Sequence, residues 1–200
     1  METLKPLGEV LESDSRQGSF VVRNRLTGEV RQRSLADIHE EVAAAQISGQ
    51  VPEEVRSAFA TAQNLMVYSW FVYAFGVLAD RQAYAVLELA LRLRLDPEGR
   101  RPRLGLRGLM KEAIRMMLLV DHGVIELVLP LVGTVERAQL DAELARPDWD
   151  AQQYVKRLVD SFGQLRNHLA HGNFALWPGQ VLTLHLVARL IDQVFSRADV

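Results

Sequence analysis

The uncharged run Leu65-Met-Val-Tyr-Ser-Trp-Phe-Val-Tyr-Ala-Phe-Gly-Val-Leu-Ala79 decides how this 200-residue chain folds. From Ser57 to the end of this run there is no charged side chain, a length that approaches the roughly 20 apolar residues of a membrane helix. Polar side chains such as Gln63 dilute the run, and the helical pattern of apolar residues continues past Asp80 to Leu91 without a break. We therefore predict a buried helix at the centre of a bundle, not a membrane span.

The rest of the chain is also expected to be mainly helical. Prolines and a glycine in Asp96-Pro-Glu-Gly-Arg-Arg-Pro-Arg103 predict a loop after the central helix, and Arg146-Pro-Asp-Trp-Asp150 predicts another. Asp148 or Asp150 is expected to cap the helix that follows. Apolar residues at spacings of three and four indicate helices over about 35–49, 52 or 64 to 95, 105–120, 124–131, 135–144, 151–171 and 178–197.

Two short segments near the start of the chain, Phe20–Arg25 and Glu29–Ser34, alternate apolar and polar residues around Leu26-Thr-Gly28. This pattern predicts a β-hairpin. Two strands alone are only marginally stable, so the hairpin must lie against a helix. The predicted fold class is therefore all-α, a helical bundle of five or six helices with a small N-terminal β-hairpin. We expect residues 1–50 to form this appendage and residues 51–200 to form the bundle.

The charge and composition of the chain limit the classes of partner. Lys plus Arg number 23 and Asp plus Glu number 25, so any contact with nucleic acid must come from a local basic patch. The chain has no cysteine, which rules out a disulfide, a thiolate nucleophile and a thiolate zinc site. The first residues lack the charged start and apolar run of a signal peptide, and we expect a cytoplasmic protein.

One stretch combines the side chains of a catalytic site: Leu165-Arg-Asn-His-Leu-Ala-His-Gly172. On a helix, Asn167 and His171 stand four residues apart on one face, and the long side chain of Arg166 can reach alongside them. These residues offer a proton carrier, a fixed positive charge and a neutral hydrogen-bonding group. Cleavage of a phosphodiester by its own 2′-hydroxyl needs a base, an acid and a donor to the phosphate oxygens. Such a reaction needs no metal and no cofactor.

The order of Arg166, Asn167, three further residues, His171 and Gly172 resembles the Arg-x4-His signature of the HEPN superfamily, a group of small helical proteins that includes many metal-independent endoribonucleases. The resemblance covers about residue 55 to the C-terminus. It implies that Arg166, Asn167 and His171 are catalytic, whereas His168 lies outside the motif. It also implies a homodimer with the motif at the subunit interface, RNA as substrate, most simply single-stranded, and an antitoxin or regulatory protein as a further partner.

Other interpretations of the motif remain open. Arg166 can simply pair with an acid on a neighbouring helix, and His171 can cap the helix, where a positive charge is stabilised by the last carbonyls. His168 and His171 are three residues apart, but the sequence shows no third ligand nearby, so no metal site is expected. The alternative function is a non-catalytic HEPN-like module for dimerisation, nucleotide binding or protein interaction.

A basic run precedes the second half of the chain. Arg100, Arg101 and Arg103 belong to a region, from Arg81 to Arg115, with nine Lys or Arg against four Asp or Glu. One interpretation is a solvated loop that keeps the bundle soluble. The other is a substrate-binding surface that follows the phosphates of an RNA strand, and the absence of aromatic residues among these arginines argues against base stacking there.

Glu88 is an acid on an otherwise apolar stretch of the central helix. A buried carboxylate must find a partner or take up a proton. Glu88 can orient Arg166 in the motif, or it can face Arg92 at the i+4 position or water. The sequence leaves both possibilities open.

Overall fold

The computed structural model describes residues 4–24, 27–99, 104–121, 150–170 and 180–196, together with the single residues 124, 138, 142 and 145. Within the two C-terminal helices, side chains are described up to Phe162 and again from Val181. The helices predicted over 124–131 and 135–144, and the basic residues Arg100, Arg101 and Arg103, fall almost entirely outside these ranges.

The described residues form six α-helices and one two-stranded antiparallel sheet. This confirms the predicted fold class, an all-α bundle with a small N-terminal β-hairpin. The elements are the 3-10 helices η1 (Leu7–Glu9) and η2 (Ser15–Ser19), the strands β1 (Val21–Arg23) and β2 (Val30–Gln32), and the helices α1 (Leu35–Ala43), α2 (Glu53–Tyr68), α3 (Phe75–Leu95), α4 (Leu106–Arg115), α7 (Gln153–Ala170) and α8 (Gln180–Ser196).

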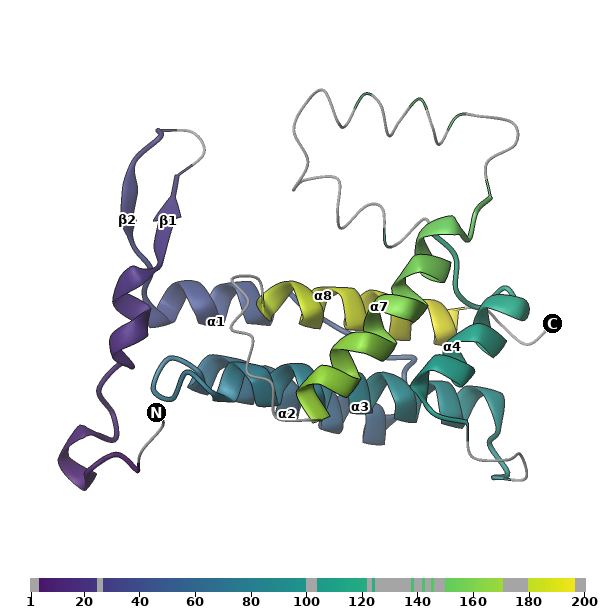
Figure 1. Ribbon diagram of the computed structural model, residues 1–200, viewed down its shortest axis with the longest axis horizontal. Helices are drawn as coiled ribbons and strands as arrows, with labels where there is room; N and C mark the ends of the chain where they lie inside the picture. Colours follow the sequence, from purple (N-terminus) through teal and green to yellow (C-terminus); the bar gives the residue numbers. More distant parts are fainter. Residues whose placement is uncertain are drawn as a thin grey trace.

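Helix α3 lies at the centre of the bundle (Figure 1), where it contacts α2, α4, α7 and α8. Its buried side chains follow a helical spacing, and Leu87 and Leu91 are completely buried in the common hydrophobic core. Helix α1 adds Ile38 and Val42 to the same core. The predicted buried central helix is therefore confirmed over Phe75–Leu95.

The central helix is nevertheless broken, and the expectation of a continuous pattern was wrong. α2 ends at Tyr68, and α3 begins at Phe75. The turn between them is held by the N-terminal segment: Gln17 donates a hydrogen bond to the carbonyl of Ser69 (2.9 Å), and the amide of Asp14 donates to the carbonyl of Trp70 (2.8 Å). These long-range contacts satisfy carbonyls that a helix would otherwise use internally.

No helix in the described ranges combines the length and the apolar character needed to cross a membrane. Several apolar side chains of this region lie inside the bundle, whereas Tyr68 and Leu78 are exposed. Phe59, Met66 and Val77 are at most 2% exposed.

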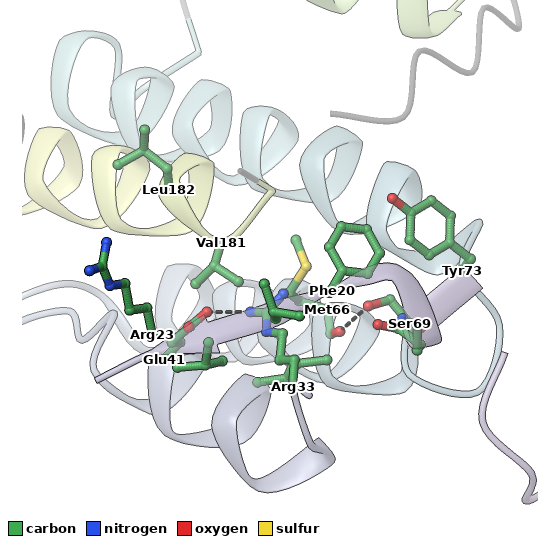
Figure 2. Close-up of a pocket in the computed structure, with 13 residues that line it drawn as sticks. Phe20, Arg23, Arg33, Glu41, Met66, Ser69, Tyr73, Val181 and Leu182 are labelled. Atoms are coloured by element: carbon green, nitrogen blue, oxygen red, sulfur yellow. Dashed lines mark hydrogen bonds and ion pairs between the residues drawn. The ribbon is translucent and has the colours of Figure 1, made fainter. Parts of the chain in front are cut away.

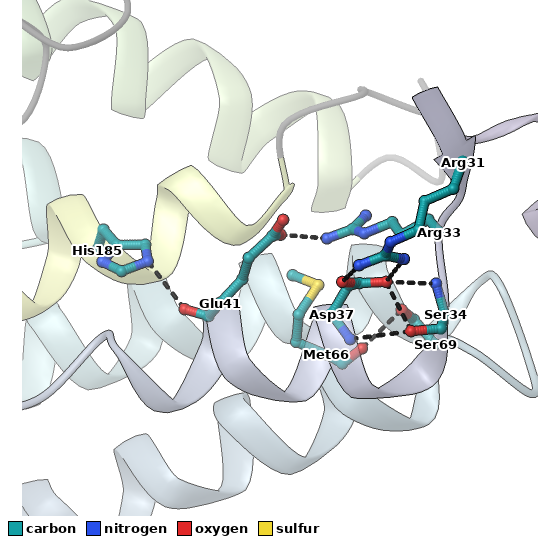
Figure 3. A network of polar contacts seen from close by, with 8 residues as sticks. All are labelled: Arg31, Arg33, Ser34, Asp37, Glu41, Met66, Ser69 and His185. Carbon is teal, nitrogen blue, oxygen red and sulfur yellow. Dashed lines mark hydrogen bonds and ion pairs between the residues drawn. The ribbon is translucent and has the colours of Figure 1, made fainter. Parts of the chain in front are cut away.

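The hairpin connects to the bundle through α1. Val21 pairs with Gln32, and Gly28 adopts a φ of 73° in the turn, a conformation that suits glycine. Ser34 then caps α1 in a reciprocal capping box with Asp37, and Arg31 of β2 pairs with the same carboxylate (Figure 3). This network fixes the angle at which the hairpin leaves the first helix.

Helix α1 ends at Ala43, six residues before the predicted end at Gly49. The side chain of Gln63 on α2 donates hydrogen bonds to the carbonyls of Val42 (3.2 Å) and Ala45 (2.8 Å). A side chain from a neighbouring helix thus replaces the next helical turn as the partner of these carbonyls.

Candidate functional site

Helix α7 carries the motif that the sequence singles out. Arg166 and Asn167 belong to its last two turns, and the helix ends at Ala170, immediately before His171. His171 lies outside the described residues, and the side chains of Arg166 and Asn167 are not described. The backbone is helical at Arg166 and Asn167, and the arrangement of the three side chains stays a prediction.

The N-terminal end of α7 is anchored by Asp121, which is 1% exposed and lies in the segment after α4. Its carboxylate accepts hydrogen bonds from the backbone amides of Tyr154 (2.9 Å) and Val155 (2.8 Å). Asp150, which was predicted as a possible cap, accepts from the amide of Gln152 (3.0 Å). The main cap of α7 therefore comes from a residue distant in sequence, and it fixes the position of this helix on the bundle.

Two side chains that flank the motif in sequence meet α3 at neighbouring positions. The ring of Phe162 on α7 packs against the ring of Tyr84 on α3, with ring centroids 4.9 Å apart. Thr183 on α8 lies beside Tyr84 and beside Asp80, one turn earlier on α3. Because a helix rises 1.5 Å per residue, the backbone of Arg166 lies about 6 Å beyond Phe162. The residues that flank the motif in sequence thus contact α3: Phe162 lies beside Tyr84, and Thr183 lies beside Tyr84 and Asp80.

Asp80 is the titratable group with the most unusual environment at this junction. Burial raises the pKa of its carboxyl group to about 7, although the Thr183 hydroxyl opposes the rise. Among the described residues, no donor lies within hydrogen-bonding distance of its buried Oδ1 atom. Burial also raises the pKa of Tyr84, and the negative charge of Asp80 adds to this effect. A carboxyl group that changes charge near neutral pH is typical of catalytic and binding sites.

The sequence did not point to Asp80. The available signal was weak: Asp80 is the first charged residue after the long uncharged run, and it stands four residues before Tyr84 on the central helix. Its importance arises from α7 and α8, which cover it in the fold. The sequence around Asp80 does not show which helices pack over it.

Glu88, the residue proposed to orient Arg166, pairs with Arg92 on its own helix at 2.7 Å. Arg92 also donates a hydrogen bond to the carbonyl of Leu104 (2.6 Å), which ties the end of α3 to the start of α4. The local partner that the sequence offered for Glu88 is confirmed, and a role toward Arg166 stays a prediction.

Arg100, Arg101 and Arg103 of the basic run lie outside the described residues, and the described basic residues nearest to them on the C-terminal side lie on α4. Arg107 pairs with Asp160 on α7 at 2.7 Å, and both side chains are exposed. This pair lies on the outer side of the contact between α4 and α7. Within the described ranges, no three His, Asp or Glu side chains gather closely enough to hold a metal ion.

Comparisons with known proteins provide no name for this arrangement. No protein-family model, curated protein or solved structure matches the chain. The resemblance to the HEPN superfamily therefore rests on the motif at the end of α7, within a helical fold of the expected class.

Proposed function

We propose that this protein is a metal-independent endoribonuclease of the HEPN type, with a catalytic site formed by Arg166, Asn167 and His171 and shared across a homodimer. The observation that carries the proposal is the motif at the C-terminal end of α7. Support comes from the anchoring of that helix by Asp121 and from the packing of Phe162, one turn before the motif, on Tyr84 of α3.

In the proposed reaction, His171 removes the proton of a ribose 2′-hydroxyl while the 2′-oxygen attacks phosphorus. The bond from phosphorus to the 5′-oxygen breaks as that oxygen receives a proton from the partner's His171. Arg166 donates two hydrogen bonds to the phosphate oxygens as negative charge grows on them, and Asn167 holds His171 or the scissile phosphate. The products are a 2′,3′-cyclic phosphate and a 5′-hydroxyl.

The dimer and the RNA strand follow from the same proposal. One motif supplies one imidazole, whereas the reaction needs both a base and an acid, so two copies make the site complete. The basic residues Arg100, Arg101 and Arg103 are proposed to hold the phosphates of a single strand beside the site.

The test is an RNA cleavage assay in EDTA with a mixed single-stranded oligonucleotide. The parent is expected to cleave it, and Arg166→Ala and His171→Ala are expected to lower the rate by at least about 100-fold. His168→Ala is the matched control, because it removes an imidazole from the same turn but outside the motif. A DNA oligonucleotide of the same sequence should stay intact because it lacks the 2′-hydroxyl.

Two outcomes would contradict the proposal. Equal inactivity of the parent and all variants would favour a non-catalytic module with the same helical face. Equal cleavage by the parent and both motif variants would show a contaminating nuclease. Sedimentation of the same samples reports whether the dimer forms, independently of cleavage.

A further inference from the structure

A surface pocket of about 500 Å³ lies between the N-terminal hairpin and the helical bundle (Figure 2), and no described residue of α7 lines it. Its walls come from β1, from α1, from the end of α2 and from the first turn of α8. Pockets that bind small organic molecules usually have volumes of about 300–1,000 Å³. The volume between hairpin and helices is therefore large enough for such a ligand.

One part of the pocket is apolar and rigid. Ile38 and Met66 are each 2% exposed and belong to the hydrophobic core, so the pocket lies directly against the core. Phe20 stacks on Tyr73 with ring centroids 5.9 Å apart, which holds both rings at the side of the pocket. Val181 of α8 lies opposite α1 (Figure 2). These side chains offer a preformed surface for an apolar group.

The charged part of the pocket is positive. Arg33 pairs with Glu41 through Nη2, and Arg23 adds a second guanidinium group, so two positive charges face one negative charge. The Nε atom of Arg33 is buried and makes no hydrogen bond with the described residues, so the groups that can face a ligand are the outer nitrogens of the two guanidinium groups. An acceptor that enters the pocket beside these nitrogens gains charge-assisted hydrogen bonds.

Two neutral polar side chains of the pocket, Gln17 and Ser69, already have partners. Gln17 donates to the carbonyl of Ser69 (2.9 Å), and the hydroxyl of Ser69 donates to the carbonyl of Met66 (2.6 Å). Polar recognition in the pocket therefore depends mainly on the arginines, and these select an anion.

We propose that this pocket binds a small organic anion with an apolar body, an acyl or aryl carboxylate, whose carboxylate accepts hydrogen bonds from Arg33 while its body lies on Ile38, Met66 and Phe20. Glu41 competes with the ligand for the same guanidinium group. The proposal is independent of the ribonuclease site, because it rests on residues of the hairpin, α1 and α2.

Isothermal titration calorimetry tests the proposal on the full chain with decanoate and 2-naphthoate as probes, which separates acyl from aryl ligands. Decan-1-ol is the uncharged counterpart of decanoate. It is expected to bind at least about tenfold more weakly, because it loses about one charge-assisted hydrogen bond to arginine. Arg33→Gln is expected to weaken carboxylate binding by about tenfold or more. Glu41→Gln removes the competing carboxylate and is expected to tighten binding about threefold.

Arg56→Gln is the matched control, because Arg56 forms an exposed ion pair on α2 away from the pocket. Glu41 is half-exposed, so Glu41→Gln is not expected to disturb the core. The affinity of this variant therefore tests the proposal even if Arg33→Gln perturbs folding. The proposal is overturned by the absence of binding for both carboxylates up to about 1 mM, by equal binding of decanoate and decan-1-ol, or by weaker binding to Glu41→Gln than to the parent.

Discussion

The buried carboxylate of Asp121 accepts a hydrogen bond from the backbone amide of Val155 at 2.8 Å and a second one from the amide of Tyr154 at 2.9 Å. Helix α7 is thereby held at one end by a residue from outside the helix, while its other end carries Arg166 and Asn167. The position of the motif relative to the bundle depends on this cap.

Replacement of Asp121 by alanine is expected to lower the free energy of unfolding by about 2–4 kcal/mol, because two buried amides lose their acceptor. Urea denaturation measures the loss. Asp160→Ala is the control, since it removes an exposed carboxylate that pairs with Arg107, and it should cost less than about 1 kcal/mol. Equal losses in the two variants would contradict the importance of the Asp121 cap.

Met117 ends α4 in a conformation that favours glycine. Its φ is 58°, its amide donates to the carbonyl of Ile114 (3.0 Å), and the amide of Leu118 donates to the carbonyl of Ala113 (2.9 Å), which is a Schellman motif. Met117→Gly is expected to stabilise the protein by about 1 kcal/mol because glycine adopts this φ without steric strain. Thermal unfolding measures the gain, and Met117→Ala, which keeps the strain, should show no gain.

Asp80 makes the stability of the protein depend on pH. Burial raises the pKa of its carboxyl group from 3.8 to about 7, so between these values the folded state holds a proton that the unfolded chain has released. The contribution of Asp80 to stability is therefore greatest near pH 4 and falls as the pH rises to about 7.

Asparagine at this position stays neutral at every pH. Asp80→Asn is expected to be more stable than the parent at pH 8, by up to about 4 kcal/mol, and to match it within about 1 kcal/mol at pH 4. Urea midpoints at the two pH values give the comparison. Asp160→Asn removes an exposed carboxylate and should change stability by less than about 1 kcal/mol at either pH. A difference for Asp80→Asn that is the same at both pH values would refute the assignment of the shift to Asp80.

The bundle could be predicted from the sequence because helices are indicated by the local, periodic spacing of apolar residues. Apolar spacing located α3, α7 and α8, and the Ser34 cap located the start of α1. The break between α2 and α3 was missed because no proline or glycine occurs between Tyr68 and Phe75. That break depends on the hydrogen bond that Gln17 donates to Ser69 and on the one that Asp14 accepts from the amide of Tyr73, and both partners lie more than 50 residues earlier in the chain.

The candidate site likewise contains residues that the sequence indicated and residues that only the fold brings together. Arg166, Asn167 and His171 could be recognised as candidate catalytic residues because they lie within six consecutive residues of the sequence. Asp80 could not be selected, since its raised pKa comes from burial where α3 meets α8, and isolated acids on helices are common. The cap of α7 was predicted in part: Asp150 accepts from the amide of Gln152, but the sequence did not indicate that the fold also brings Asp121 to the helix.

The contact between Phe162 and Tyr84 provides a direct test of where α7 lies. Phe162 is 3% exposed, and its ring lies 4.9 Å from that of Tyr84. In a double-mutant cycle of Phe162→Leu and Tyr84→Leu, the two substitutions should couple by about 0.5–1.5 kcal/mol, because the aromatic pair is lost with either one. The control cycle pairs Phe162→Leu with Phe59→Leu on α2, and coupling there should be below about 0.5 kcal/mol. If the first cycle also shows no coupling, α7 does not pack on α3 at this point, and the placement of Phe162 beside Tyr84 is wrong.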